Sequence, residues 1–174
     1  NIGCSYCYAR MNNNRFHTID DFNKPVFFEN KLKMLNNKRH TAYLLTGQSD
    51  LSGWNEEWKD KVFSKMKENE NTQYIFLIKR PENINLKETP DNGWFGVTVT
   101  SSKEKTRIDY LRNNIKANHY HITFEPMFDD VGKLDLSNIS WIVIGTETGN
   151  RKGKISSKRE WVFNIYNQAK EKNI

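Results

Sequence analysis

The sequence has little of what marks a secreted or membrane protein. Its only two cysteines, Cys4 and Cys7, are separated by two residues. Cysteines this close cannot cross-link a core, so we do not expect a disulfide-built secreted module. The longest uninterrupted apolar run, Tyr74 to Ile78, is far shorter than the roughly 20 residues of a membrane-spanning helix. We therefore expect a cytoplasmic protein with no membrane partner.

Charge of one sign does not dominate the chain either. There are 27 lysines and arginines against 21 acidic residues, a formal net charge of +6. This mild excess favours anionic partners but is too small for a nucleic-acid-binding tail. No low-complexity tract, sequence repeat or glycine-serine linker interrupts the 174 residues, so the composition predicts one domain.

Short apolar runs alternate with amphipathic stretches, which predicts an α/β fold. The runs are nearly solid, as in parallel strands covered on both faces. The expected strands are Thr41–Thr46, Tyr74–Ile78, Trp94–Val99, His119–Phe124 and Trp141–Gly145. The expected helices carry Trp54, Trp58, Val62 and Met66; Ile108, Leu111 and Ile115; and Trp161, Ile165 and Ala169.

Two of these helices follow a Ser-x-x-Glu pattern, typical of a capping box. The pairs are Ser101 with Glu104 and Ser157 with Glu160. Repeated βα units form either an open doubly wound sheet or a barrel, and periodicity alone leaves both alternatives open.

Polar residues follow every expected strand. The clusters are Thr46–Asp50, Lys79–Glu82, Thr98–Thr100, Phe124–Pro126 and Gly145–Gly149. The carboxyl ends of parallel strands meet at one edge, where ligands bind in α/β proteins. We therefore expect these clusters to converge on one site, although loop-forming residues after a strand would give a similar pattern.

The Cys-x-x-Cys sequence of Cys4 and Cys7 is compatible with a zinc half-site, a redox dithiol or part of an iron-sulfur loop. Zinc needs further ligands, and His17, His40, His119 and His121 show no matching spacing. We expect the pair His119 and His121 to be split between the two faces of its strand. A thioredoxin-type dithiol would open a helix after a strand, whereas here a run of asparagines follows.

With Tyr6 directly before Cys7, the loop resembles the Cys-x3-Cys-x-aromatic-Cys signature of the radical S-adenosylmethionine (SAM) superfamily. The rest of the chain resembles a smaller branch of that superfamily, found in phages and mobile elements, some of whose members are called radical SAM mobile pair proteins. The matching stretches are Gly3–Arg10, Leu45–Asp50, Phe76–Glu82, Trp94–Thr100, Phe124–Pro126 and Trp141–Gly149. The resemblance places the first motif cysteine directly before Asn1.

The resemblance implies one domain over residues 1–174, a partial (β/α) barrel of the radical SAM type with outer helices. A complete barrel has about 250 residues, so we expect the domain to be incomplete at both ends and inactive alone. The implied enzyme uses a [4Fe-4S] cluster, with Cys4 and Cys7 as two of its three ligands, to cleave SAM into methionine and a 5′-deoxyadenosyl radical. A reductant such as flavodoxin or ferredoxin and a second radical SAM protein are implied partners.

The remaining site residues follow from the same resemblance. Lys79 or Arg80 would pair with the SAM carboxylate, because arginine offers a bidentate fork. The Gln48-Ser49-Asp50 cluster would contact the methionine amino group, with Asp50 as the acceptor. Glu125 and Glu147 would hold ribose hydroxyls or substrate, and Gly145 and Gly149 would let the backbone approach the adenosine. For each acidic residue a helix cap or an ion pair is the alternative.

The basic run from Arg151 to Arg159 follows the last expected strand. It is typical either of a solvated loop or of a rim that gathers a phosphate-bearing substrate or a nucleic acid. A non-catalytic nucleic-acid- or partner-binding protein, with a zinc or degenerate cluster site on the same fold, is therefore the alternative to the enzyme. The substrate and the catalytic residues acting on it are not identified by the sequence.

Overall fold

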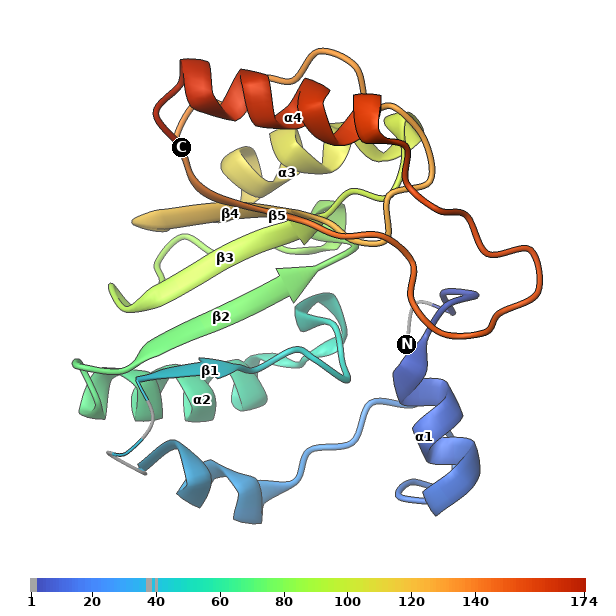
Figure 1. The fold of residues 1–174 in the computed structure, drawn as a ribbon. Coiled ribbons are helices and arrows are strands. Elements are labelled where there is room, and N and C mark those ends of the chain that lie inside the picture. The colour runs from blue at the N-terminus through green and yellow to red at the C-terminus, as the bar shows by residue number, and fades with distance from the viewer. Residues whose placement is uncertain (1–2, 37–38, 40) are drawn as a thin grey trace.

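The computed structural model describes residues 3–36, 39 and 41–174, and its centre is a five-stranded parallel sheet (Figure 1). The strands are β1 (Ala42–Leu44), β2 (Gln73–Ile78), β3 (Gly93–Thr98), β4 (His119–Phe124) and β5 (Ile139–Ile144). Their order in space is their order in the chain, with every neighbouring pair parallel. The α/β prediction and all five expected strands are therefore confirmed, and all strands end at one edge, the carboxyl edge.

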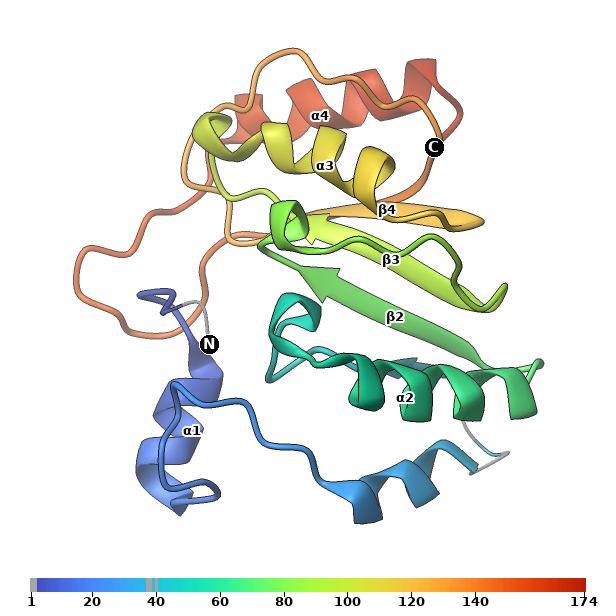
Figure 2. The same cartoon turned by 180° about the vertical axis from the view of Figure 1, so that it is seen from behind.

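Helices flank the sheet in the described part of the chain. They are α1 (Tyr8–Phe16), α2 (Glu56–Glu68), α3 (Thr106–Asn114) and α4 (Arg159–Glu171), with 3-10 turns η1 (Glu29–Asn36), η2 (Leu51–Gly53), η3 (Pro81–Asn83) and η4 (Ser102–Glu104). Figure 2 shows α2 and α3 in front of the strands, on one face of the sheet. The three helices expected from periodicity are present. No described helix has the length and apolar character needed to span a membrane.

The hydrophobic core lies between the sheet and its helices. On β2 the side chains of Tyr74, Phe76 and Ile78 are fully buried, and Phe76 stacks on Phe95 of β3 at a ring-centroid distance of 4.7 Å. Met66 of α2, also fully buried, belongs to the same core. The period of two along β2 selects these residues for the helix-covered face.

The other face of the sheet, which we call the open face, is less covered than the sequence predicts. Leu44 and Trp141 are 55% and 40% exposed, and Trp94 and His119 are half-buried. The prediction that both faces are covered is therefore wrong for the described chain. Solid apolar runs concealed this asymmetry because the outward positions of β2 and β5 are apolar as well.

Neither predicted capping box forms. The Glu104 carboxylate accepts hydrogen bonds from the backbone N–H and the hydroxyl of Thr100, at 2.7 and 2.8 Å, and α3 begins only at Thr106. The Ser157 hydroxyl donates to the Met127 carbonyl at 3.0 Å, while α4 begins at Arg159. In both places the polar side chains join a loop to a strand end instead of closing a helix terminus.

His119 and His121 share the open face, which corrects the expectation that they are split between the two faces. Residues two apart on a strand point the same way. The His119 ring stacks on Trp94 at 4.4 Å, and the His121 ring packs over Gly96 and lies 5.3 Å from Trp141. These rings form an aromatic layer toward the amino ends of β3 and β4, leaving the polar groups of the sheet at its carboxyl edge.

Candidate functional site

The two cysteines lie in a tight turn at the start of α1. The Cys7 N–H donates to the Cys4 carbonyl at 3.2 Å, and Cys7 is the residue that precedes the helix. Both thiols are half-buried and neither forms a disulfide. The first turn of α1 contains no acidic residue, so the positive end of its helix dipole is not neutralised locally.

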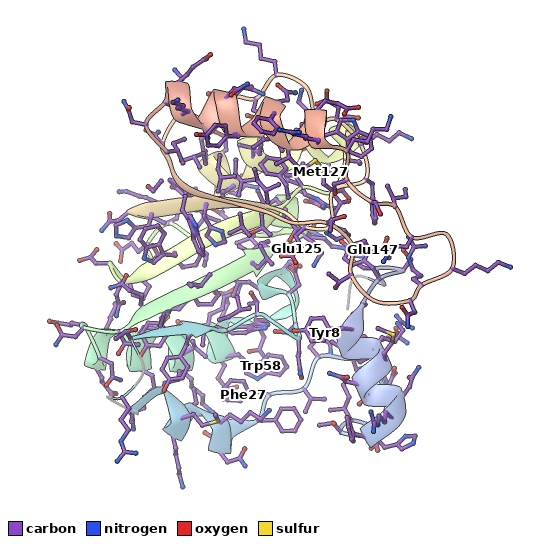
Figure 3. All side chains as sticks on the ribbon, viewed as in Figure 1. Tyr8, Phe27, Trp58, Glu125, Met127 and Glu147 are labelled. Atoms are coloured by element: carbon purple, nitrogen blue, oxygen red, sulfur yellow. The ribbon has the colours of Figure 1, made fainter. Side chains whose placement is uncertain are left out.

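Aromatic contacts hold this turn against the carboxyl edge of the sheet. The ring of Tyr6 packs edge-on against Phe128, which follows β4, and the Lys79 ammonium at the end of β2 lies 5.9 Å from the Tyr6 ring centroid. The Tyr8 hydroxyl donates to the carbonyl of Gly47, which follows β1. Three strand-end loops therefore meet the cysteine turn, as the clustering of polar residues predicts. Figure 3 shows Tyr8 and Glu125 on this side of the sheet.

Tyr6 remains protonated at this position. Burial, followed by the neighbouring Cys4 thiol, raises the pKa of the phenol well above its usual value. Tyr6 therefore offers an apolar ring and a hydroxyl donor beside the cysteines, and adds no negative charge to the turn.

A charged network under the end of β3 was missed by the sequence analysis. The Arg107 guanidinium donates to the Thr98 carbonyl at 2.7 Å and pairs with Glu104 at 2.9 Å. Both charged groups act electrostatically on Tyr6. The sequence does contain a signal for this pair. Glu104 and Arg107 are three residues apart shortly after a strand, which is a spacing typical of an ion pair on one helical turn.

In the described part of the chain, three adjacent strands place at this edge a polar group whose side chain has no hydrogen bond or ion pair. Lys79 follows β2, Thr98 ends β3 and Glu125 follows β4. The Thr98 hydroxyl is fully buried and has no hydrogen-bond partner among the described residues, and within the same part of the chain Lys79 and Glu125 make no ion pair. The Lys79 ammonium and the Glu125 carboxylate are therefore not committed to ion pairs within the described residues, whereas the Thr98 hydroxyl is enclosed by the protein.

The structure gives Gly145 a role different from the predicted one. A Cβ at Gly145 would lie 2.9 Å from both Cγ and Cδ of Glu125, so the missing side chain provides space for Glu125 rather than for a ligand. Gly149 has a φ of 79° and nothing within 4 Å of the position of a Cβ, which indicates that it is needed for the turn.

Asp50 is largely buried and its carboxylate is engaged by the protein. It accepts from the Ser52 N–H at 3.0 Å, from the Ser52 hydroxyl at 2.6 Å and from the Lys79 N–H at 2.7 Å. It caps η2 and joins that turn to the end of β2. Asp50 therefore has the role of a helix cap, which was the alternative to a ligand-binding role. Ser49 accepts from the indole N–H of Trp54 at 3.2 Å, whereas Gln48 is exposed.

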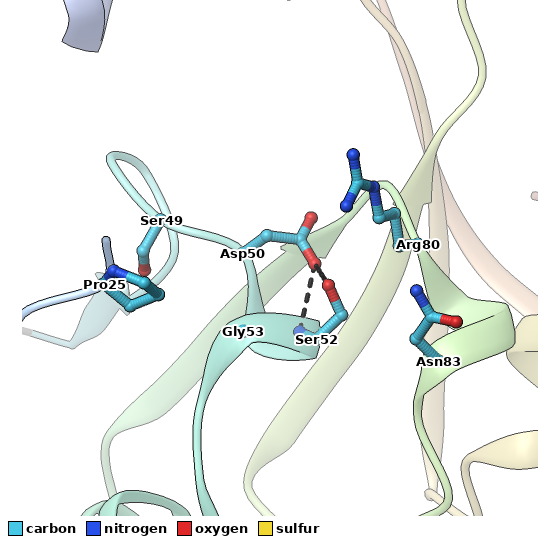
Figure 4. Close-up of a pocket in the computed structure, with 7 residues that line it drawn as sticks. All are labelled: Pro25, Ser49, Asp50, Ser52, Gly53, Arg80 and Asn83. Atoms are coloured by element: carbon cyan, nitrogen blue, oxygen red, sulfur yellow. Dashed lines mark hydrogen bonds between the residues drawn. The ribbon is translucent and has the colours of Figure 1, made fainter. Parts of the chain in front are cut away.

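Lys79 and Arg80, which the sequence could not separate, point to different places. Lys79 lies at the Tyr6 ring, whereas Arg80 lines a cavity together with Asp50 and Ser49 (Figure 4). Only one of the two cations therefore belongs to the group of residues around the cysteine turn.

Glu147 is also engaged internally. Both of its carboxylate oxygens accept from the Arg151 guanidinium, one of them at 2.7 Å, and this pairing lowers the pKa of Glu147. The Lys154 ammonium donates to the Gly149 carbonyl at 3.1 Å. The ion-pair alternative thus describes Glu147, and part of the basic run shapes its own loop.

Comparison with known proteins places the chain in a family. A family model described as a protein of unknown function, DUF5131, matches residues 1–174. The chain belongs to the DUF5131 family. No curated protein and no solved structure gives a significant match.

The cysteine turn of this DUF5131 protein presents two thiols beside positive electrostatic groups. Its two thiols are free and half-buried, a helix amino terminus begins at Cys7, and Lys79 stands beside Tyr6. Residues 3–36, 39 and 41–174 contain no group of three histidine, cysteine or acidic side chains placed to hold a metal. His40, one of the histidines considered for zinc, lies outside the described residues. A metal held by Cys4 and Cys7 would therefore need at least one ligand from outside the described residues.

Proposed function

We propose that this DUF5131 protein is a radical SAM enzyme built on a partial (β/α) barrel. The observation that carries the proposal is the position of the Cys4–Cys7 turn at the carboxyl edge, where Lys79 at the end of β2 lies beside Tyr6. A strand order without reversal supports the barrel, because a doubly wound sheet reverses direction at its switch point. Family membership alone supplies no activity.

Cys4 and Cys7 would hold a [4Fe-4S] cluster together with a third cysteine, which the motif places directly before Asn1. When bound, the cluster and SAM supply a one-electron cleavage of the sulfur–C5′ bond, whose electron comes from a flavodoxin- or ferredoxin-type donor and whose radical product removes a hydrogen atom from the substrate. The thiols are held on a short turn rather than on separate elements, which keeps both on one side of such a cluster.

The neighbouring side chains would bind and orient the cofactor. Lys79, rather than Arg80, is the cation that would pair with the SAM carboxylate, because it lies beside Tyr6 within the cysteine turn. Glu125, which is exposed at the end of β4, would accept hydrogen bonds from ribose hydroxyls. Gly145 keeps Glu125 in place, and Tyr6 with Phe128 excludes water from that wall of the site.

The test uses the natural protein with the residues that precede Asn1. After anaerobic reconstitution we expect about four irons per chain and 5′-deoxyadenosine that forms only with a reductant. Cys7→Ala should lose both. Lys79→Met should keep the iron content but weaken SAM binding about tenfold, the loss of one charge-assisted contact. Arg80→Met is the matched control and should bind SAM normally. Wild-type protein that takes up neither iron nor SAM would refute the proposal.

A further inference from the structure

The loop between β5 and α4 carries positive charge that the proposed enzyme does not use (Figure 1). Within residues 151–159 there is no acidic side chain, and the cations are Arg151, Lys152, Lys154, Lys158 and Arg159. Arg151 is paired with Glu147, and Lys158 lies 4.0 Å from Glu160. The side chains of Lys152 and Arg159 make no hydrogen bond or ion pair to the part of the chain that the structure describes. The loop therefore exposes positive charge that its own folding does not neutralise.

Two exposed aromatic rings on α4 adjoin this charge. Phe163 and Tyr166 are 46% and 52% exposed, and their ring centroids lie 6.2 Å apart at an interplanar angle of 76°. The Arg159 guanidinium lies over the Phe163 ring, 5.1 Å from its centroid. A guanidinium held over a ring keeps its N–H donors directed to the surroundings. The cation and the two rings therefore form one continuous surface.

Helical geometry places these residues in a single row. Because each residue turns a helix by about 100°, residues that follow at intervals of four, three and four share one face. On α4 such a row consists of four exposed residues: Arg159, Phe163, Tyr166 and Lys170. Glu160 and Glu171 lie about a quarter turn to one side of it. The row is about 16 Å long, with a cation at each end and two rings between them.

This pattern of charge and rings fits single-stranded nucleic acid. Phosphates pair with exposed cations, and an unpaired base stacks on an aromatic ring whatever its identity. A duplex would use the cations but has its base faces already stacked, so the rings would gain nothing. An acidic protein segment supplies the charge without a ring at each repeat, whereas every nucleotide supplies both.

We propose that a basic-aromatic strip on the loop and on α4 binds single-stranded nucleic acid. The strip consists of Lys152, Arg159, Phe163, Tyr166 and Lys170. Its cations pair with phosphates, the ring of Tyr166 stacks on a base, and Phe163 positions the Arg159 guanidinium. No residue of the strip belongs to the cysteine turn or to the groups assigned to SAM, so the proposal goes beyond the radical chemistry and does not depend on it.

Fluorescence anisotropy of the natural protein tests this with a labelled thymidine strand of about 15 nucleotides and with the same strand as a duplex. The single strand should bind saturably and more tightly than the duplex. The logarithm of its affinity should fall with the logarithm of the salt concentration, with a slope of about −0.7 for each phosphate contacted. Tyr166→Ala should weaken binding about tenfold, the loss of one stacked base, at an unchanged salt slope. Tyr166→Phe keeps the ring and should bind like the wild type.

Lys152→Gln combined with Lys170→Gln should weaken binding and make the salt slope shallower by about 1.4, because two phosphate contacts are lost. Phe16→Ala is the matched aromatic control. Phe16 is 64% exposed and carries the Arg15 guanidinium over its ring at 5.0 Å, but it lies on α1. Lys87→Gln is the charge control, since Lys87 is exposed and lies outside the strip. Both controls should bind the strand like the wild type.

The substituted side chains are all exposed, so the fold should persist, and circular dichroism checks it. The proposal is overturned by a wild type that shows no saturable binding of the single strand at low salt, or by Tyr166→Ala with wild-type affinity. Equal or tighter binding of the duplex would refute base stacking, and an equal loss in Phe16→Ala would place the binding elsewhere. Failed iron uptake would contradict the proposed function alone, because the strip holds no group assigned to the cluster.

Discussion

Replacing Gly96 with alanine tests how the open face of the sheet is packed. A Cβ at Gly96 would overlap the ring of His121, whose Nε2 bonds to the Phe76 carbonyl at 3.0 Å across β3. The ring has to move, because the added methyl group is fixed to the backbone. Overpacking costs about 1–3 kcal/mol and an unpaired buried polar group about 1–3 kcal/mol more. We therefore expect Gly96→Ala to destabilise the protein by about 4 kcal/mol.

Urea denaturation followed by circular dichroism measures this loss, which corresponds to about 8–16 °C in Tm for a domain of this size. Gly53→Ala is the control, since its Cβ would meet only Pro25 at an ordinary 3.4 Å and should change stability by less than about 1 kcal/mol. Adding His121→Ala to Gly96→Ala removes the overlap, so the two changes should cost less together than the sum of each alone. A Gly96→Ala protein as stable as the wild type would show that the ring position is not constrained.

Two further predictions concern pH. Burial lowers the pKa of His121 to about 4 from its usual 6.5, so the unfolded chain binds a proton in that interval and the folded chain does not. Stability should fall by about 3 kcal/mol on acidification from pH 6.5 to 4, and His121→Gln should lose most of this slope in urea titrations at each pH. For Glu147, the Arg151 guanidinium holds the pKa below its usual range, so the pair stabilises the fold above that range and the contribution disappears as the pH falls through the lowered pKa. Arg151→Ala should be less stable at pH 7 with a shallower acid limb, and an unchanged acid limb would contradict this account.

Much of the fold could be predicted because two sequence patterns are strong: short apolar runs for the strands, and apolar residues three and four apart for the helices. The apolar run Tyr74–Ile78 identifies a strand, and the spacing of Trp58, Val62 and Met66 identifies a helix and its buried face. The shared edge of the polar clusters then follows from parallel strand geometry, and at that edge Lys79 lies beside Tyr6 of the cysteine turn. How far each face of the sheet is covered could not be predicted, because the sequence does not show whether another element packs on an apolar residue such as Trp141.

The roles of individual carboxylates depended on backbone geometry that a motif does not encode. Asp50 and Glu125 both follow strands, yet Asp50 accepts from the N–H groups of Ser52 and Lys79, whereas Glu125 makes no side-chain hydrogen bond within the described residues. The spacing of Glu147 and Arg151 suits an ion pair, but only the course of the loop shows that the pair forms. The error over His119 was different in kind, since the two-residue repeat of a strand already places it beside His121.

The sequential order of the strands also bears on how the chain folds. Each strand finds its partner in the unit immediately before or after it, so no strand waits for a distant segment to complete its hydrogen bonds. Such pairing allows assembly to proceed by successive docking of βα units, in the order in which a ribosome delivers them. A unit damaged near the middle of the series, as by a substitution at Gly96, would interrupt this docking where β3 must receive β4, while β1 and β2 could still pair.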